Sequence, residues 1–224
     1  MSHKAAFFDL DGTLLTVNSG RLWMQRERRE GRISAWQQAK ALVYLLGYRF
    51  GLIDMHRVMG KALQTVKGLP EQTVREWTEA WYEAEVKPLA APGAWAAIQK
   101  HREAGDLLVL LTSSSPYESA VALRHFGLDH ALSTRYEVAD GRFTGEVIVP
   151  MCYGHGKVEI AEAFAAEHEL DLAASAFYSD SITDLPMLER VGAPRVVNPD
   201  PRLKRQAAKR GWPVLDWTKS SAVG

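Results

Sequence analysis

The sequence AAFFDLDGTL, residues 5–14, carries an apolar run into two closely spaced carboxylates. Residues 5–8 are uninterrupted apolar residues, which is typical of a strand buried on both faces of a parallel sheet. Because side chains alternate along a strand, Asp9 and Asp11 would point the same way, at the carboxyl edge of the sheet. Open α/β sheets bind their ligands at that edge. A hairpin turn beginning at Asp11 is the alternative, but residues 18–20 resemble a helix start and not a second strand.

Similar short apolar segments recur further along the chain. Residues 107–111 and 176–178 predict two more buried strands, and an Asp-Gly pair within residues 136–149 predicts a β-hairpin. Proline and glycine at the expected ends predict helices at residues 94–103, 116–126, 157–167 and 201–210. Strands that alternate with helices in this way predict an α/β fold, with a doubly wound (Rossmann-like) parallel sheet.

The segment 17–88 breaks this alternation, because it contains no convincing strand. Four helices are expected in it, over residues 18–31, 34–47, 54–66 and 70–88. Asn18 or Ser19 would cap the first of them. We therefore expect an α/β core built from residues 1–16 and 89–224, with an all-helical domain inserted between them.

Composition places the chain among ordinary globular proteins. Of its 224 residues, 46% are hydrophobic and 24% are charged, which excludes a disordered or collagen-like chain. Lys plus Arg and Asp plus Glu both number 27, so no net charge attracts the protein to nucleic acid or to anionic membranes.

The longest apolar stretch, residues 41–53, is too short to span a bilayer. Cys152 is the single cysteine, which fits a reducing cytosol. We expect a cytoplasmic protein without nucleic-acid partner or stable membrane insertion, and its oligomeric state stays open.

Two more carboxylates follow the strand predicted at residues 176–178. Asp180 and Asp184 fit the acidic N-terminus of a helix, but that interpretation accounts for one acid and not for both. Four carboxylates at one sheet edge would repel one another and raise their own pKa values. A hard divalent cation with oxygen ligands removes that repulsion, and Mg²⁺ is the usual choice beside phosphate.

Residues that favour an anion complete the pattern. Thr112 and Ser113 follow a predicted strand and precede a helix, so a hydroxyl and free backbone N–H groups would form an anion site; a serine-rich loop is the plainer interpretation. Lys157 opens a helix against the preference of the helix dipole, which indicates an anionic partner, although a solvated lysine is the default. Cys152 and His155 lack a third group to orient them, so a Cys-His nucleophile is not expected.

In this order and at these strand ends, the four groups resemble the motifs of the haloacid-dehalogenase-like (HAD) hydrolase superfamily. The helical insert is similar to the cap of its phosphoserine-phosphatase-like branch (subfamily IB, with a C1-type cap). The resemblance covers nearly the whole chain. Residues 9–14 match the first motif, Thr112 the second, Lys157 the third, and Asp180 with Asp184 the fourth.

The resemblance implies a role for each of these residues. Asp9 would be the nucleophile that forms an aspartyl-phosphate, and Asp11 would be the general acid and base. The phosphoryl oxygens would be held by Thr112, the Ser113 N–H and Lys157. The ligands of Mg²⁺ would be Asp9, the backbone carbonyl of Asp11, Asp180 and, close by or through water, Asp184.

These roles predict a Mg²⁺-dependent phosphatase that hydrolyses a small phosphate monoester. Asp11 would supply the proton that a leaving oxygen needs, whereas a dehalogenase lacks this second acid because its leaving group needs no proton. In phosphoserine phosphatases an acidic residue nine positions after the nucleophile reads the substrate amine; Asn18 holds that position here and weighs against phosphoserine. Histidinol phosphate, amino-alcohol phosphates and phospholipid head groups stay open as substrates. The alternatives are a phosphotransferase or mutase with the same intermediate, and a catalytically silent phosphate-binding regulatory module. The complete set of acids argues against the module.

Overall fold

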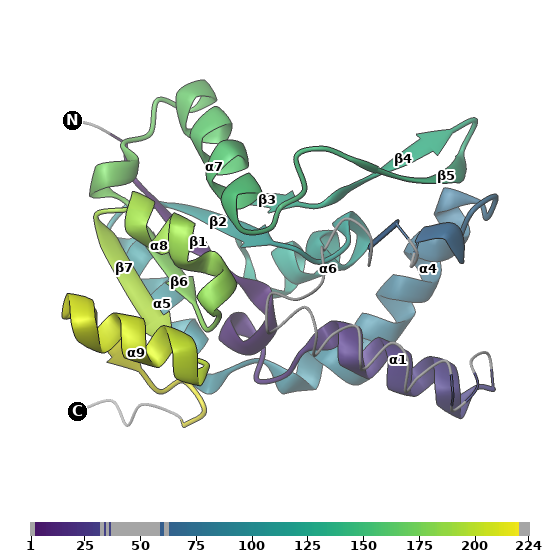
Figure 1. Ribbon diagram of the computed structural model, residues 1–224, viewed down its shortest axis with the longest axis horizontal. Coiled ribbons are helices and arrows are strands. Elements are labelled where there is room, and N and C mark those ends of the chain that lie inside the picture. The colour runs from purple at the N-terminus through teal and green to yellow at the C-terminus, as the bar shows by residue number, and fades with distance from the viewer. Residues whose placement is uncertain (1–2, 32–33, 35, 37–58, 61–62, 220–224) are drawn as a thin grey trace.

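The structure of the protein, a computed structural model, describes residues 3–31, 34, 36, 59–60 and 63–219 (Figure 1). The helices expected at residues 34–47 and 54–66 lie largely outside these residues. Within the described ranges, every helix is too short or too polar to cross a membrane.

A six-stranded sheet forms the centre of the molecule. Its strands run parallel in the order β3-β2-β1-β6-β7-β8, which is a doubly wound arrangement. Their bounds are Ala5–Phe8 (β1), Leu107–Thr112 (β2), His130–Ser133 (β3), Ala176–Ser179 (β6), Ala193–Val197 (β7) and Val214–Leu215 (β8). Within the sheet, Phe8 lies beside Leu110 on one side and Tyr178 on the other. The predicted α/β, Rossmann-like fold is confirmed.

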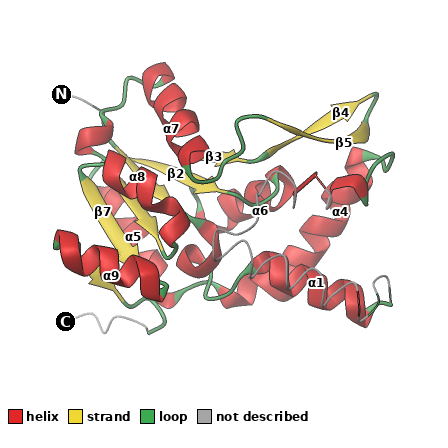
Figure 2. Ribbon diagram, in the orientation of Figure 1, coloured by secondary structure: helices red, strands yellow, loops and turns green. Residues whose placement is uncertain are grey.

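Helices cover both faces of the sheet (Figure 2). One face holds α5 (Pro92–Glu103) and α6 (Pro116–Phe126), and the other holds α7 (His155–Glu167), α8 (Leu185–Arg190) and α9 (Pro201–Arg210). Along β1, Ala6 and Phe8 pack toward the first pair of helices, while Ala5 and Phe7 pack toward the other three. A strand between two helical layers must be apolar on both sides, which is why residues 5–8 form an unbroken apolar run.

The segment predicted to be a helical insert, residues 17–88, leaves the sheet and returns to it at one place. Its described helical elements include α1 (Ser19–Arg29), α4 (Glu71–Trp81) and two short turns, Tyr82–Val86 and Lys87–Leu89. Asn18 caps α1 by accepting a hydrogen bond from the Arg21 N–H at 3.0 Å. Leu15 pairs antiparallel with Ala90, so the outgoing and incoming chains lie side by side. The division into a core and an inserted domain at residues 17–88 stays a prediction.

The predicted β-hairpin is confirmed, and it extends from the sheet to the insert (Figure 1). Its strands are β4 (Arg135–Ala139) and β5 (Arg142–Ile148). Asp140 and Gly141 join them with positive φ at both positions, as this two-residue turn requires. The Phe143 N–H donates to the Leu69 carbonyl at 3.1 Å, and the Phe143 carbonyl accepts from the Gly68 N–H at 2.8 Å. Backbone hydrogen bonds therefore tie the hairpin to the insert.

Gly192 joins α8 to β7 where the chain passes close to residues 172–174. A methyl group at Gly192 would lie 1.7 Å from the Ala173 carbonyl oxygen, far inside van der Waals contact. Gly192→Ala should lower the free energy of unfolding by roughly 1–3 kcal/mol, the usual cost of overpacking. Gly60→Ala is the control, since a methyl group there meets nothing within 4 Å. Urea denaturation measures both variants, and equal stability would contradict the close backbone approach.

Candidate active site

The carboxyl edge of the sheet gathers residues from distant parts of the chain. Asp9 follows β1, Thr112 ends β2, Asp180 follows β6, and Lys157 lies in the first turn of α7. Because β1 lies between β2 and β6, three of these residues come from adjacent strands. The structure thus brings together the residues that the motifs place at one site.

Lys157 is buried between two carboxylates. Its Nζ donates to Asp9 Oδ1 at 2.9 Å and to Asp184 Oδ2 at 2.8 Å, and the residue is 2% exposed. Ser179, the last residue of β6, donates its hydroxyl to the same Asp184 oxygen at 2.7 Å. Burial opposes the charge on Lys157, but Asp184 and Asp9 together raise its pKa above the ordinary range. The lysine that opens α7 therefore has the anionic partners expected from its position.

The site carries more negative charge than Lys157 neutralises. Burial, opposed by Lys157 and aided by Asp184, raises the pKa of Asp9 to about 7. Burial and then the charges of Asp9 and Asp184 raise the pKa of Asp180 well above its usual value. No donor among the described residues forms a hydrogen bond to the Asp180 carboxylate. This excess charge favours either protonation of an acid or the arrival of a cation.

Asp11 is held in place by the start of α1. The Ser19 N–H donates to Asp11 Oδ1 at 2.9 Å, and Asn18 Nδ2 donates to Asp11 Oδ2 at 3.0 Å. Burial raises the pKa of Asp11, against the hydrogen bond from the Ser19 backbone, which lowers it. The Asn18 amide is used at both ends, because its oxygen accepts from the Arg21 N–H. Asn18 therefore orients Asp11 and caps α1 within the protein itself.

Loops on either side of Asp9 complete the edge. Gly12 has a φ of +71°, and a Cβ there would lie 2.4 Å from Asp180 Oδ2, so glycine lets this loop approach the carboxylate. The Thr112 hydroxyl is buried and accepts from the Ser114 N–H at 3.2 Å. Because α6 begins directly after this loop, its N-terminus favours an anion there.

A divalent cation fits the chemistry of this donor set. Asp9, Asp180 and the backbone carbonyl of Asp11 offer oxygen atoms, which hard cations such as Mg²⁺ prefer. The excess negative charge is a second observation in favour of a cation. However, across the part of the chain that the structure describes, no three His, Cys, Asp or Glu side chains converge closely enough to hold a metal ion. Donor chemistry and charge support the cation, whereas the side chains do not form a complete coordination shell by themselves.

Two residues at this edge are not predicted by the motifs. Ser179 supports Asp184, and its signal is only its place at the end of a strand, directly before Asp180. Glu118 is buried in the first turn of α6. With Ser115 it forms an S-x-x-E pattern, which is typical of a helix cap. Burial raises the pKa of Cys152 to about 12, which disfavours the thiolate that a nucleophile would need.

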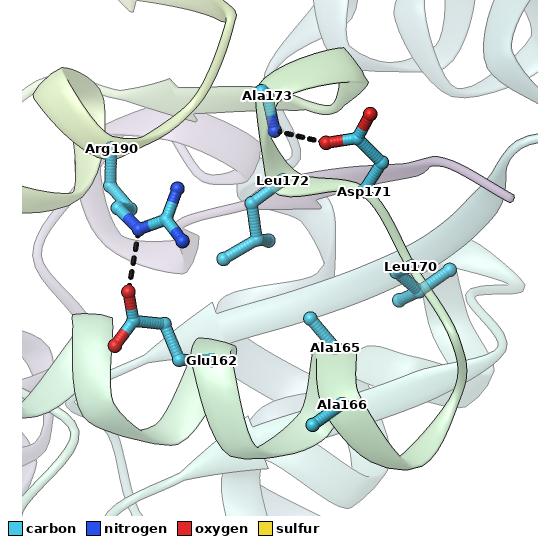
Figure 3. A pocket seen from close by; sticks show the side chains of 8 residues that line it. All are labelled: Glu162, Ala165, Ala166, Leu170, Asp171, Leu172, Ala173 and Arg190. Carbon is cyan, nitrogen blue, oxygen red and sulfur yellow. Dashed lines mark hydrogen bonds and ion pairs between the residues drawn. The ribbon is translucent and has the colours of Figure 1, made fainter. Parts of the chain in front are cut away.

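A hollow of about 440 Å³ lies away from these residues, beside the C-terminal half of α7 (Figure 3). Glu162 and Arg190 form an ion pair at its rim, at 2.5 Å. Asp171 uses its carboxylate to accept from the Ala173 N–H at 2.8 Å. The polar side chains that line this hollow therefore already have partners within the protein. The carboxylates at the sheet edge are the stronger candidate site.

Comparison with known proteins connects this site to a family. The chain matches the family model described as haloacid dehalogenase-like hydrolase over residues 6–189. It is 34% identical over 221 residues to a probable phosphatase of Mycobacterium tuberculosis, and the match covers 97% of this chain and 77% of the relative. It is 29% identical over 217 residues to a histidinol-phosphatase of Neisseria meningitidis, with 95% of this chain and 98% of the relative covered.

Solved structures share the architecture as well. A protein of unknown function from Bordetella pertussis has a TM-score of 0.86 at 31% identity, covering 97% of this chain and 100% of that one. A substrate-bound phosphoserine phosphatase has a TM-score of 0.71 at 20% identity, covering 99% of this chain and 95% of that one, and shows the same fold. The family match spans most of the chain, from within β1 to within α8. The resemblance seen in the motifs is confirmed, and the chain belongs to the haloacid dehalogenase-like hydrolase family.

Proposed function

We propose that the protein is a phosphatase that hydrolyses a small phosphate monoester through a phosphoryl group carried on Asp9. The observation that carries this proposal is the contact between Lys157 and Asp9. Lys157 Nζ holds Asp9 Oδ1 at 2.9 Å, which fixes the carboxylate and leaves Oδ2 as the nucleophile. The relatives named as phosphatases, one of them for histidinol phosphate, support a phosphate ester as the substrate.

The reaction proceeds in two displacements at phosphorus. In the first, Asp9 Oδ2 forms a bond to phosphorus while the ester P–O bond breaks, and protonated Asp11 gives its proton to the departing oxygen. In the second, water attacks the aspartyl-phosphate, Asp11 takes a proton from that water, and phosphate leaves Asp9 free. Burial raises the pKa of Asp11, which favours the protonated form that the first step needs.

Residues around Asp9 would hold the phosphoryl group and the cation. The phosphoryl oxygens would be held by Thr112, the Ser113 N–H and Lys157. Mg²⁺ would be held by Asp9, the backbone carbonyl of Asp11, Asp180 and, directly or through water, Asp184. When bound, the cation neutralises the charge that gathers between these carboxylates and the phosphate.

The insert of residues 17–88 would select the leaving group. Asp11 meets the leaving oxygen in this mechanism, and Asn18 and Ser19 at the start of the insert hold Asp11. The leaving group therefore faces the insert, while the core of residues 1–16 and 89–224 carries the phosphoryl chemistry.

Asp9→Asn should reduce phosphate release at least about a thousandfold, because an amide does not serve as the nucleophile. Release of phosphate from p-nitrophenyl phosphate and histidinol phosphate with Mg²⁺ measures the change. Asp140→Asn is the matched control and should keep full activity, since asparagine tolerates the φ of 50° at this hairpin turn. If the Asp9→Asn variant keeps a tenth or more of wild-type turnover, Asp9 is not the nucleophile.

Asp11→Asn should affect esters according to their leaving groups. Alkyl phosphates should slow by about 10²–10⁴, because their alkoxide needs a proton as it departs. Nitrophenolate leaves without that proton, so p-nitrophenyl phosphate should slow far less. Values of kcat for both esters check this, and an equal loss for the two would show that Asp11 does not act as the general acid.

Titration of the buried acids should make stability depend on pH. The pKa of Asp9 rises from 3.8 to about 7 on folding, and that of Asp180 rises too, so the folded chain keeps protons that the unfolded chain releases. Stability of the metal-free protein should therefore fall as pH rises through this interval.

Mg²⁺ should offset that loss near pH 8 and have little effect near pH 5, where the acids are protonated. Melting temperatures in EDTA and in Mg²⁺ at both pH values measure this; each kcal/mol corresponds to about 2–4 °C in a chain of this size. Asp180→Asn should raise the metal-free melting temperature near pH 8 and weaken the response to Mg²⁺. An equal response to Mg²⁺ at both pH values would contradict the assignment.

A further inference from the structure

Glu118 is a buried carboxylate that the proposed mechanism leaves without a role. It lies in the first turn of α6 and is 6% exposed. Its N–H donates to the Ser115 hydroxyl at 3.1 Å, which caps the helix. In a complete capping box the acid would also accept from the Ser115 N–H. That bond does not form within the described residues, and Glu118 Oε1 has no hydrogen-bond partner there. Capping of α6 therefore does not explain why this carboxylate is buried.

The Glu118 carboxylate is an electrostatic neighbour of Asp11. Burial and the charge of Asp11 raise the pKa of Glu118 to about 8. The hydroxyls of Ser19 and Ser114 lie close enough to lower it, although neither forms a well-aligned hydrogen bond to Oε1. Burial and then the charge of Glu118 raise the pKa of Tyr136 in the hairpin. Glu118 thus belongs to the surroundings of the residue that meets the leaving oxygen.

No cation compensates Glu118 within the part of the chain that the structure describes. Lys157 is already bonded to Asp9 and Asp184. Asn18 is neutral, and its amide already contacts Asp11 and the cap of α1, so it supplies no positive charge to Glu118. Without a positive partner a buried acid is driven toward its protonated form, and a cationic ligand would restore its charge; beside a reacting centre such an acid is a candidate ligand-binding group.

We propose that Glu118 binds a positively charged nitrogen on the leaving group of the substrate. This inference rests on the proposed function and narrows its substrates to phosphate esters of small cationic alcohols. The leaving oxygen lies at Asp11, and a nitrogen a few atoms further along the leaving group reaches Glu118. An N–H of that nitrogen donates a charge-assisted hydrogen bond to Oε1 and supplies the partner that this oxygen lacks.

Pairs of esters that differ in charge test the proposal on the wild-type protein. 2-Aminoethyl phosphate and 2-hydroxyethyl phosphate are nearly isosteric, and only the first carries an ammonium group. Imidazol-4-ylethyl phosphate and 2-phenylethyl phosphate form the second pair, in which the cation is an imidazolium. In at least one pair kcat/KM should favour the cationic ester by about tenfold or more, the effect of one charge-assisted hydrogen bond. The pair that shows the preference identifies the kind of cation.

Glu118→Gln keeps the size of the side chain and removes its charge. For the preferred cationic ester, kcat/KM should fall about tenfold or more, while for its neutral partner it should stay within about threefold. The neutral ester thus also reports that the variant is folded. Glu159→Gln, on an exposed face of α7, is the matched control and should leave both values unchanged.

The outcomes separate this inference from the proposed function. Wild-type protein that hydrolyses p-nitrophenyl phosphate but treats neutral and cationic esters alike overturns the role of Glu118 and leaves the phosphatase standing. A Glu118→Gln variant that still prefers the cationic ester also overturns that role. If the variant does not fold, the ester pairs measured on the wild-type protein decide the question. Wild-type protein that hydrolyses none of these esters overturns both proposals.

Discussion

Negative charge buried at one edge of the sheet is the constraint that the rest of the structure answers. Asp9, Asp180 and Asp184 meet there from two adjacent strand ends, and Lys157 lies between two of them. Carboxylates removed from water destabilise a fold unless they are paired, protonated or bound to a cation. A chain under selection for stability alone would not gather them, which is why their convergence indicates chemistry.

The doubly wound topology makes this convergence possible. Parallel strands end at the same edge, so β1, β2 and β6 deliver their following residues to one place although those residues are far apart in sequence. Helices that follow such strands begin at the same edge, and α6 therefore presents its N-terminus beside the site. Lys157, in the first turn of α7, violates the dipole preference of its own helix, and the two carboxylates that it contacts outweigh that preference.

The site has two sides with different origins. In the proposed mechanism, Thr112 and Lys157 from the core would bind the phosphoryl group, and these roles follow from the chemistry shared by every phosphate ester. In the same proposal, the start of the insert and Glu118 in α6 would form the leaving-group side. Here Asn18 is neutral and contacts Asp11 and the cap of α1, so an acid that could bind a cationic leaving group has to come from elsewhere, and we propose Glu118.

Local patterns were sufficient for the first strand, the hairpin turn at Asp140–Gly141 and the helices at 116–126 and 201–210, because short-range sterics and apolar periodicity govern them. Motif order likewise pointed to Asp9, Asp184 and Lys157, which the structure brings into contact, while their roles stay proposals. Strands β3 (HALS), β7 (APRVV) and the two-residue β8 have no comparable signal, since neighbouring strands supply the hydrogen bonds that make them strands. Nor does local pattern distinguish Glu118 as a helix cap from Glu118 as a buried acid whose pKa responds to Asp11. That distinction depends on burial and on charges brought close by long-range packing, and these exist only once the chain has folded.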